Sequence, residues 1–297
     1  MKYILLGAGG LLGTGFRTQL DHRDVDYLLV QPPWNLVSEL PRVIRSDLAR
    51  LMEGSAPVTL IWAAGIGHVG ASANDLTSET AGIQALADAL RDLPPSRSSA
   101  MTILFASSAG ALFAGVEGVI NEGTPPRPLA SYGLEKLRQE DLLRNVAQET
   151  GARVVACRMS NLYGLTSGRL RPRGLIATAI RCARLRQPMT VFVSPDTRRD
   201  YLLNADAAAL ALRLGERAPG GFSTALVREG RTRTIAEIFS LVGAVTRRRV
   251  PVVYAQRPES LLQPRALRFA PPRPGEGIRL TPLETGIARM AMAPLAR

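Results

Sequence analysis

Tyr132 and Lys136 stand four residues apart in the segment SYGLEK. On a helix this spacing puts both side chains on one face. A phenol titrates near pH ~10, and a neighbouring ammonium favours the phenolate, which makes the tyrosine a competent acid or base at neutral pH. Lys2 and Lys136 are the only lysines among 37 basic residues. The sequence therefore predicts an acid–base pair, and a solvated helix lysine is the weaker alternative.

Three glycines near the N-terminus have the spacing of a nucleotide-binding turn. Gly7, Gly10 and Gly13 form a GxxGxxG between an apolar segment, 2–6, and a helical pattern, 11–20. Glycine is needed where the chain turns tightly, where backbone approaches a pyrophosphate at a helix N-terminus, and where a helix packs closely on a strand. A glycine triplet alone is weak evidence, but its position between strand and helix favours dinucleotide binding over a plain turn.

The residue expected to select the cofactor is a glutamine. An acidic residue about 20 positions further on, at the end of the second strand, holds the ribose 2′-hydroxyl of NAD in many such proteins. Gln31 has that place here, and no arginine follows at once to favour a 2′-phosphate, although Arg42 and Arg45 could fold back. The cofactor, NAD or NADP, is therefore left open. Asp47 is expected near the adenine, and a surface aspartate is an almost equal alternative.

The elements that must position these residues alternate along the first half of the chain. Expected strands are 2–6, 27–30, 58–64, 101–106 and 154–158, and expected helices are 11–20, 80–93 and 130–149. Strands alternating with helices predict an α/β fold, a Rossmann-type doubly wound parallel sheet. After about Tyr163 the elements become shorter, with a helix at 235–245 and a strand at 250–254. We therefore expect an NAD(P)-binding domain over 1–165 and a smaller α+β, mainly substrate-binding domain over 166–297, with some segments returning to the first sheet.

The two halves of the chain carry opposite net charge. Residues 1–150 hold 12 Lys and Arg against 16 Asp and Glu, whereas residues 151–297 hold 25 against 9. The two halves of the chain are therefore expected to have different roles. Aromatic residues make up 5% of the chain and do not interleave with basic stretches, so nucleic-acid binding is not expected.

Several other classes of protein are excluded by composition. Cys157 and Cys182 provide neither a disulfide framework nor a cluster of metal ligands, so no metal is expected. No segment approaches the ~20 apolar residues of a membrane helix, and the apolar N-terminus lacks a convincing signal-cleavage site. The sequence predicts a cytoplasmic protein without membrane contact.

Five motifs in matching order and spacing resemble the extended short-chain dehydrogenase/reductase family, in its NAD-dependent epimerase/dehydratase branch. They are GAGGLLG (7–13), LFASSAGALFAG (104–115), SYGLEK (131–136), RMSNLYG (158–164) and RRDYLLNADAAA (198–209). The resemblance implies an NAD(P)-dependent oxidoreductase or epimerase acting on a nucleotide-diphosphate sugar. An epimerase returns the hydride to the other face of the ketone, whereas a reductase stops after one transfer; both stay open.

The same resemblance implies roles for individual residues. Ser108, with Ser107 as second choice, is expected to polarise the reacting oxygen beside Tyr132, and Lys136 to bond the nicotinamide ribose as well. Substrate contacts are expected from Asn161, from Arg199 or its neighbour Arg198, and from Arg257. The expected cofactor contacts are Gly7, Gly10, Leu11, Leu12, Gly13, Gln31, Asp47, Leu48, Ala63, Ala64, Gly65, Ser107, Tyr132 and Lys136.

The chain also departs from the family's pattern. Phe113 stands where many relatives have tyrosine, Trp62 replaces a common histidine, and Glu79 falls near a customary asparagine. Ala109-Gly110 replaces the Asp-Glu pair of dehydratases, so no dehydration is expected. A ketoreductase of a non-sugar metabolite and a non-catalytic dinucleotide-sensing protein remain alternatives. Relatives often pair through the helices corresponding to 80–93 and 130–149, so the resemblance also allows a homodimer.

Overall fold

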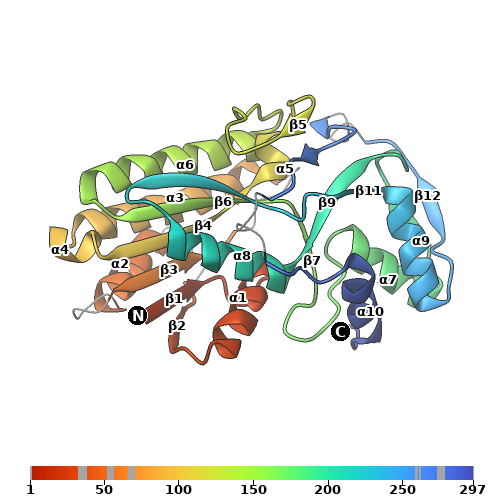
Figure 1. The fold of residues 1–297 in the computed structure, drawn as a ribbon, viewed down its shortest axis with the longest axis horizontal. Coiled ribbons are helices and arrows are strands. Elements are labelled where there is room, and N and C mark those ends of the chain that lie inside the picture. The colour runs from red at the N-terminus through yellow and green to blue at the C-terminus, as the bar shows by residue number, and fades with distance from the viewer. Residues whose placement is uncertain are drawn as a thin grey trace.

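The structure, a computed structural model, describes residues 2–32, 39–51, 57–65, 71–257, 260, 262–272 and 278–296. A six-stranded sheet runs through the larger part of the molecule (Figure 1). Its strands are β1 (Lys2–Leu6), β2 (Tyr27–Val30), β3 (Val58–Trp62), β4 (Met101–Ser108), β6 (Arg153–Met159) and β10 (Phe222–Val227). They lie in the order β10-β6-β4-β3-β1-β2, and each pairing is parallel. The predicted doubly wound parallel sheet is confirmed.

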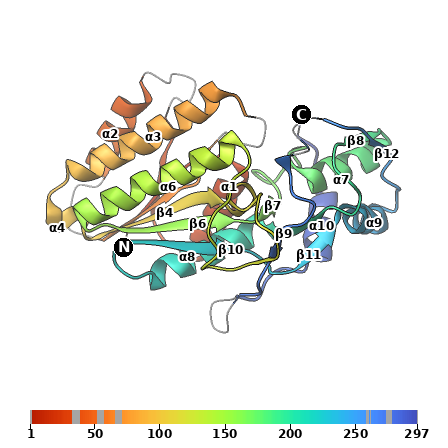
Figure 2. The same ribbon diagram turned by 90° about the horizontal axis from the view of Figure 1, so that it is seen from above.

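Helices cover both faces of this sheet (Figure 2). One face carries α2 (Leu40–Leu51), α3 (Ala73–Arg91) and α6 (Ser131–Thr150), and the other carries α1 (Leu11–His22) and α8 (Asn204–Arg217). Successive strand residues point to opposite faces. In β1, therefore, Ile4 and Leu6 pack in the first layer while Tyr3 and Leu5 pack in the second. This double burial explains the continuous apolar runs of the strands.

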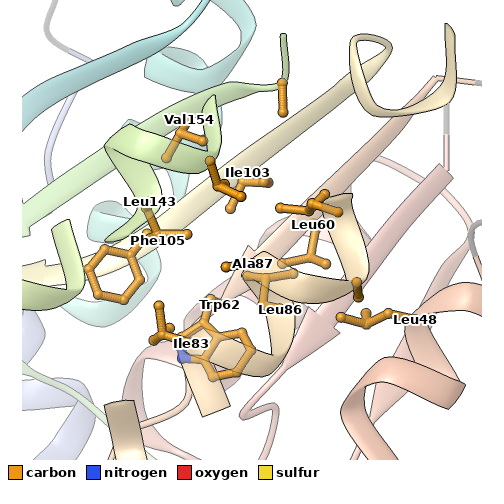
Figure 3. Close-up of a cluster of buried hydrophobic side chains, with 14 of the residues drawn as sticks. Leu48, Leu60, Trp62, Ile83, Leu86, Ala87, Ile103, Phe105, Leu143 and Val154 are labelled. Carbon is orange, nitrogen blue, oxygen red and sulfur yellow. The ribbon is translucent and has the colours of Figure 1, made fainter. Parts of the chain in front are cut away.

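The first of these layers contains two large aromatic side chains, Trp62 and Phe105. Figure 3 shows the rings of Trp62 and Phe105, from two neighbouring strands, with the helical residue Ile83 beside Trp62 and Leu143 beside Phe105. All four side chains are fully buried. Gly82 gives Trp62 its place, because a Cβ there would come within 3.2 Å of the indole ring. The tryptophan that replaces a family histidine is thus a core residue in this chain.

The connection order creates a crevice beside β1. The chain leaves β1 through α1 to β2 at the edge of the sheet, and then returns through α2 to β3 on the other side of β1. These two helices lie on opposite faces of the sheet. Consecutive connections that diverge in this way leave an opening at the carboxyl ends of β1 and β3, which is where open α/β sheets bind ligands.

The six-stranded sheet and the helices on its two faces form the first lobe. The second lobe consists of shorter elements packed around a separate core of buried side chains. Its helices are α7 (Leu175–Leu185), α9 (Ile235–Thr246) and α10 (Leu283–Met292), and a sheet of β7 (Asn161–Tyr163), β9 (Arg198–Leu203) and β11 (Thr232–Thr234) joins them to the first lobe. Smaller elements are β8 (Met189–Val191) with β12 (Val252–Tyr254), β5 (Val119–Ile120) with β13 (Arg268–Phe269), and the single turns α4 (Pro95–Ser98) and α5 (Ala109–Leu112).

The predicted elements of the first half are present, with shifts at their ends. The helix expected from residue 80 begins at Ala73, because Ser72 and Asp75 form a capping box. The strand expected at 250–254 begins at Val252. The helices α3 and α6 pack side by side (Figure 2), and a homodimer through them stays a prediction. Among the described residues no helix is long and apolar enough to span a bilayer.

Candidate active site

The glycine turn connects β1 to α1 with a backbone that larger residues would not fit. Gly7 has φ +83°, and a Cβ on it would lie 2.5 Å from the backbone nitrogen of Ala64. A Cβ on Gly13 would overlap the carbonyl of Gly7. Gly10 is the N-cap of α1, and the first turn, from Leu11 to Thr14, is uncharged. The first N–H groups of a helix lack intrahelical acceptors, so this turn presents donors suited to an anion.

A cavity of about 240 Å³ opens directly beside this turn. It is lined by Gly7, Gly9, Gly10, Ala63, Ala64, Gly65, Ser78 and Glu79. The lining thus comes from the carboxyl ends of β1 and β3, on either side of the reversal in strand order, and from α3. The predicted glycines and the predicted Ala63–Gly65 segment lie together at the position that the fold reserves for a ligand.

The remaining predicted cofactor contacts lie at different depths. Gln31 is exposed and directly follows β2. Asp47 is half-buried on α2, whereas Leu48 is fully buried in the layer of Figure 3. Leu11 and Leu12 open α1, with Leu12 packed in the opposite layer. Their contacts with a cofactor stay predictions.

Lys136 lies next to the glycine cavity, where α6 passes over the end of β4. Its side chain is buried, with its Nζ atom 5.9 Å from the centre of the Tyr132 ring one helical turn earlier. Nζ donates to Glu79 Oε1 at 2.6 Å, to Gln139 Oε1 at 3.2 Å and to the Ala106 carbonyl at 3.3 Å. Burial is the largest single effect and lowers the pKa of Lys136, but Glu79, Tyr132 and Glu140 together more than offset it, so the pKa lies above its ordinary value.

The two candidate serines have different surroundings. Ser107 is buried, and its hydroxyl donates to Glu140 Oε1 at 2.6 Å. Glu140 is fully buried and also receives two bonds from Arg158, Nη2 to Oε2 at 2.7 Å and Nε to Oε1 at 3.1 Å. Ser108 is half-buried, and its Oγ accepts the N–H of Ala111 at 3.3 Å as the cap of α5. An accepting hydroxyl keeps its own proton for donation, which favours Ser108 as the polarising serine.

Asn161 reaches the same place from the first residue of β7. A Cβ on Gly110 would lie 3.9 Å from Asn161 Oδ1 and 4.0 Å from Ser108 Oγ, so the amide and the hydroxyl flank one glycine. Asn161 is exposed. Phe113, which replaces the family tyrosine, is fully buried with its ring centre 5.4 Å from the guanidinium carbon of Arg158. The Phe113 ring therefore packs against the guanidinium that pairs with Glu140.

The predicted arginines lie in the second lobe. Arg199 is buried on β9, donates to the Arg198 carbonyl at 2.8 Å, and has a pKa lowered by burial. Arg257 is exposed, and its guanidinium carbon lies 3.7 Å from the centre of the Phe192 ring. This stack forms one wall of a cavity of about 730 Å³, whose lining is Phe192, Val193, Ser194, Thr197, Gln256, Arg257, Ser260, Gln263 and Arg265. The structure thus provides a second hollow, lined by a flat ring and a cation. One of its lining residues, Thr197, lies two residues before Arg199 in the chain.

Sequence reasoning missed the partners of the catalytic candidates. Local motifs give no role to Glu140 or Gln139, and Glu79 stands out only as a departure from the family's pattern. The sequence of α6 contains one signal that could have found them. Lys136, Gln139 and Glu140 are polar residues on the helix face whose other members are apolar and buried, which indicates a buried polar cluster. Within the described part of the chain, no group of three or more His, Cys, Asp or Glu side chains is placed to hold a metal ion.

Curated relatives match parts of the chain. UDP-glucose 4-epimerase of Azospirillum brasilense is 31% identical over 168 residues, 51% of this chain and 48% of that protein. dTDP-4-dehydro-6-deoxyglucose reductase of Escherichia coli is 30% identical over 104 residues, 35% of this chain and 33% of that protein. These alignments therefore cover between a third and a half of each relative.

Solved structures match over nearly the whole length. UDP-glucose 4-epimerase of Thermus thermophilus, in complex with NAD, superposes with a TM-score of 0.82 at 20% identity and 98% coverage of both chains. UDP-glucuronic acid 4-epimerase of Bacillus cereus, with UDP-glucuronic acid and NAD, gives 0.79 at 16% identity and the same coverage. At these identities the likeness establishes the fold. The sequence model of the NAD dependent epimerase/dehydratase family matches residues 3–223, about three quarters of the chain, and the chain belongs to that family.

Proposed function

We propose that this chain is an NAD(P)-dependent oxidoreductase or epimerase that acts on a nucleotide-diphosphate sugar, with Tyr132 as its acid–base group. The observation that carries the proposal is the position of Lys136. Its buried ammonium lies one helical turn from Tyr132 and shares a carboxylate, Glu79, with the lining of the glycine cavity. A proton-transfer group and a dinucleotide cradle thus adjoin each other.

The residues around the cavity fit a nicotinamide dinucleotide. The glycine turn leaves room for backbone to approach a pyrophosphate, and the uncapped N-terminus of α1 suits its negative charge. Gly7, Gly10 and Gly13 would hold the pyrophosphate, Ala63–Gly65 the adjoining sugar, and Lys136 the nicotinamide ribose. The bound cofactor supplies hydride transfer to and from the sugar carbon.

The protein's own groups handle the proton of that sugar carbon's hydroxyl. Tyr132 accepts this proton when the carbon is oxidised and returns it when the ketone is reduced. Ser108 donates a hydrogen bond to the same oxygen, and Asn161, on the other side of Gly110, contacts the substrate. Lys136 contributes a positive charge in a buried site, where charges interact more strongly than in water.

The second hollow supports a nucleoside diphosphate as the handle of the substrate. A base can stack in a cavity walled by the Phe192 ring, and the guanidinium of Arg257 suits phosphate oxygens. Arg199 adds a buried cation whose lowered pKa reflects the cost of its burial, which a nearby anion would offset. Relatives that act on UDP- and dTDP-sugars support the same class of substrate.

The direct test is Tyr132→Phe, which removes the transferable proton and keeps the ring. Turnover of UDP- or dTDP-hexoses is expected to fall by at least about 10³-fold, with NAD(P) binding unchanged by calorimetry. Full activity of this variant would refute the mechanism.

Mass spectrometry of nucleotides released from the denatured protein then separates two modes of action. NAD retained near one equivalent supports an epimerase, which recycles its cofactor. An empty protein stabilised by added NADPH supports a reductase, and no response to either cofactor would refute the dinucleotide site.

A further inference from the structure

We propose that Glu79 is a positioning residue that holds the Lys136 ammonium, balances its charge, and thereby sets the pH range in which Tyr132 exchanges its proton. The proposal rests on the proposed function, since it takes Tyr132 and Lys136 as the acid–base pair. It concerns a residue of α3 that is 57 positions away from Lys136 in the sequence.

Glu79 lies between the glycine cavity and Lys136. Its side chain is 3% exposed, and Oε1 is 2.6 Å from Lys136 Nζ. On the other side it reaches Gly65, where a Cβ would lie 3.2 Å from Glu79 Oε2, and it lines the cavity together with Gly7. The carboxylate is therefore placed to act on Lys136 from the ligand side.

The hydrogen bonds of Lys136 indicate which of its acceptors a ligand hydroxyl would replace. An ammonium has three N–H donors, and the structure shows three acceptors, Glu79 Oε1, Gln139 Oε1 and the carbonyl of Ala106. A ligand hydroxyl must replace one of them to bond to Nζ. Gln139 and Ala106 are neutral and lie at 3.2 and 3.3 Å, whereas Glu79 is charged and lies at 2.6 Å. Glu79 is therefore the partner that Lys136 retains when a ligand binds.

Among the residues that the structure describes, the charges around Lys136 are paired element by element. From α3 it faces Glu79, and from its own helix it faces Tyr132 and Glu140. Glu140 is in turn matched by Arg158 of β6 through two hydrogen bonds, while β4 contributes the Ala106 carbonyl. Because Arg158 balances Glu140, the carboxylate that balances Lys136 is Glu79.

This balance determines the cost of ionising Tyr132. With Glu79 present, the group of Tyr132, Lys136 and Glu79 is neutral while the phenol is protonated, and losing the proton leaves a net negative charge in a buried region. With a neutral residue at position 79, the same loss takes the group from one positive charge to neutrality. The first proton of the coupled pair Tyr132 and Lys136 must then leave at lower pH.

The test is a spectroscopic titration of the phenolate in the nucleotide-free protein. The absorbance change of Tyr132 is isolated by subtracting the titration of Tyr132→Phe, once in the native background and once in Glu79→Gln. Glutamine keeps the size of the side chain and an acceptor oxygen for Lys136. The ionisation of Tyr132 is expected to move to lower pH by at least about one unit, and the acid limb of the pH–rate profile for sugar oxidation should move with it.

Two variants serve as controls. Asp141→Asn removes an exposed carboxylate of the same helix as Lys136, one that pairs with Arg144 and not with Lys136, so both titrations should keep their native position. Glu79→Asp keeps the charge and should return most of the native profile. If Glu79→Gln does not fold, Glu79→Asn is the second neutral variant and should show the same shift.

An unchanged Tyr132 titration in a folded neutral variant would overturn the proposal, even if activity were lost, because that result describes a purely structural residue. This outcome differs from failure of the proposed function. Full turnover by Tyr132→Phe would refute the proposed function. An active Glu79→Gln enzyme with an unchanged Tyr132 titration would refute only the role of Glu79.

Discussion

Ser107 and Ser108 are neighbours at the end of β4, and their replacement by alanine is expected to affect different properties. Ser107→Ala should lower the stability of the protein, whereas Ser108→Ala should lower kcat. Ser107→Ala removes a 2.6 Å bond to the buried carboxylate of Glu140. A hydrogen bond to a charged group contributes about 1.5–3 kcal/mol, and Glu140 keeps two bonds from Arg158, so the lower end applies. At roughly 2–4 °C per kcal/mol for a large domain, the Tm should fall by about 3–6 °C while kcat stays within about threefold.

Ser108→Ala removes the donor that we assign to the reacting oxygen. Loss of one such donor lowers kcat by about 10²–10³-fold. The cap on α5 is lost as well, but α5 is a single turn and the cost is expected near the lower limit for caps, about 0.5 kcal/mol. Thermal unfolding and steady-state kinetics on the two variants measure both effects. A loss of kcat at Ser107 equal to that at Ser108, or full activity of Ser108→Ala, would refute the division of roles.

Further substitutions test the glycine turn and the second hollow. Gly13→Ala should destabilise the protein, because its Cβ would overlap the carbonyl of Gly7, whereas Gly9→Ala meets no protein atom within 4 Å and should unfold at the native Tm with weaker NAD(P) binding. A lower Tm for Gly9→Ala than for Gly13→Ala in thermal scans would contradict this. Arg257→Ala should raise KM for a nucleotide sugar by about tenfold or more with little change in kcat, since it removes binding common to ground and transition states. Unchanged KM would favour the ketoreductase alternative.

Sequence patterns predicted the first lobe well because its strands are buried on both faces. The central residues of these strands, such as Tyr3–Leu6 in β1 and Ile103–Ala106 in β4, form short apolar runs, so they indicate strands without knowledge of the rest. α2 was not predicted. Its buried residues Ile44 and Leu48 lie four apart among charged residues, and Pro41 lies in its first turn, where proline is tolerated but hides the helical pattern.

The site was predictable where local motifs carry it and hidden where distant residues meet. The motif SYGLEK gave the spacing of Tyr132 and Lys136, and α6 contains both. The carboxylate that meets Lys136 comes from another helix, and nothing in the residues around Glu79 indicates that contact. The stack of Arg257 on Phe192 likewise joins residues 65 positions apart. Such pairings depend on how the lobes fold, which local sequence does not encode.

The two buried ion pairs beside α6 explain why this chain, with 35 arginines, keeps a lysine at position 136. At Glu140, a planar guanidinium from Arg158 makes two near-parallel bonds to one carboxylate, the geometry in which arginine excels. One turn away, Lys136 meets three acceptors from three different elements, α3, β4 and its own helix. A compact ammonium can direct its donors to all three, whereas a flat fork cannot. Each cation therefore suits the acceptors around it, and Lys136→Arg should disrupt the contact with Glu79 even though it keeps the charge.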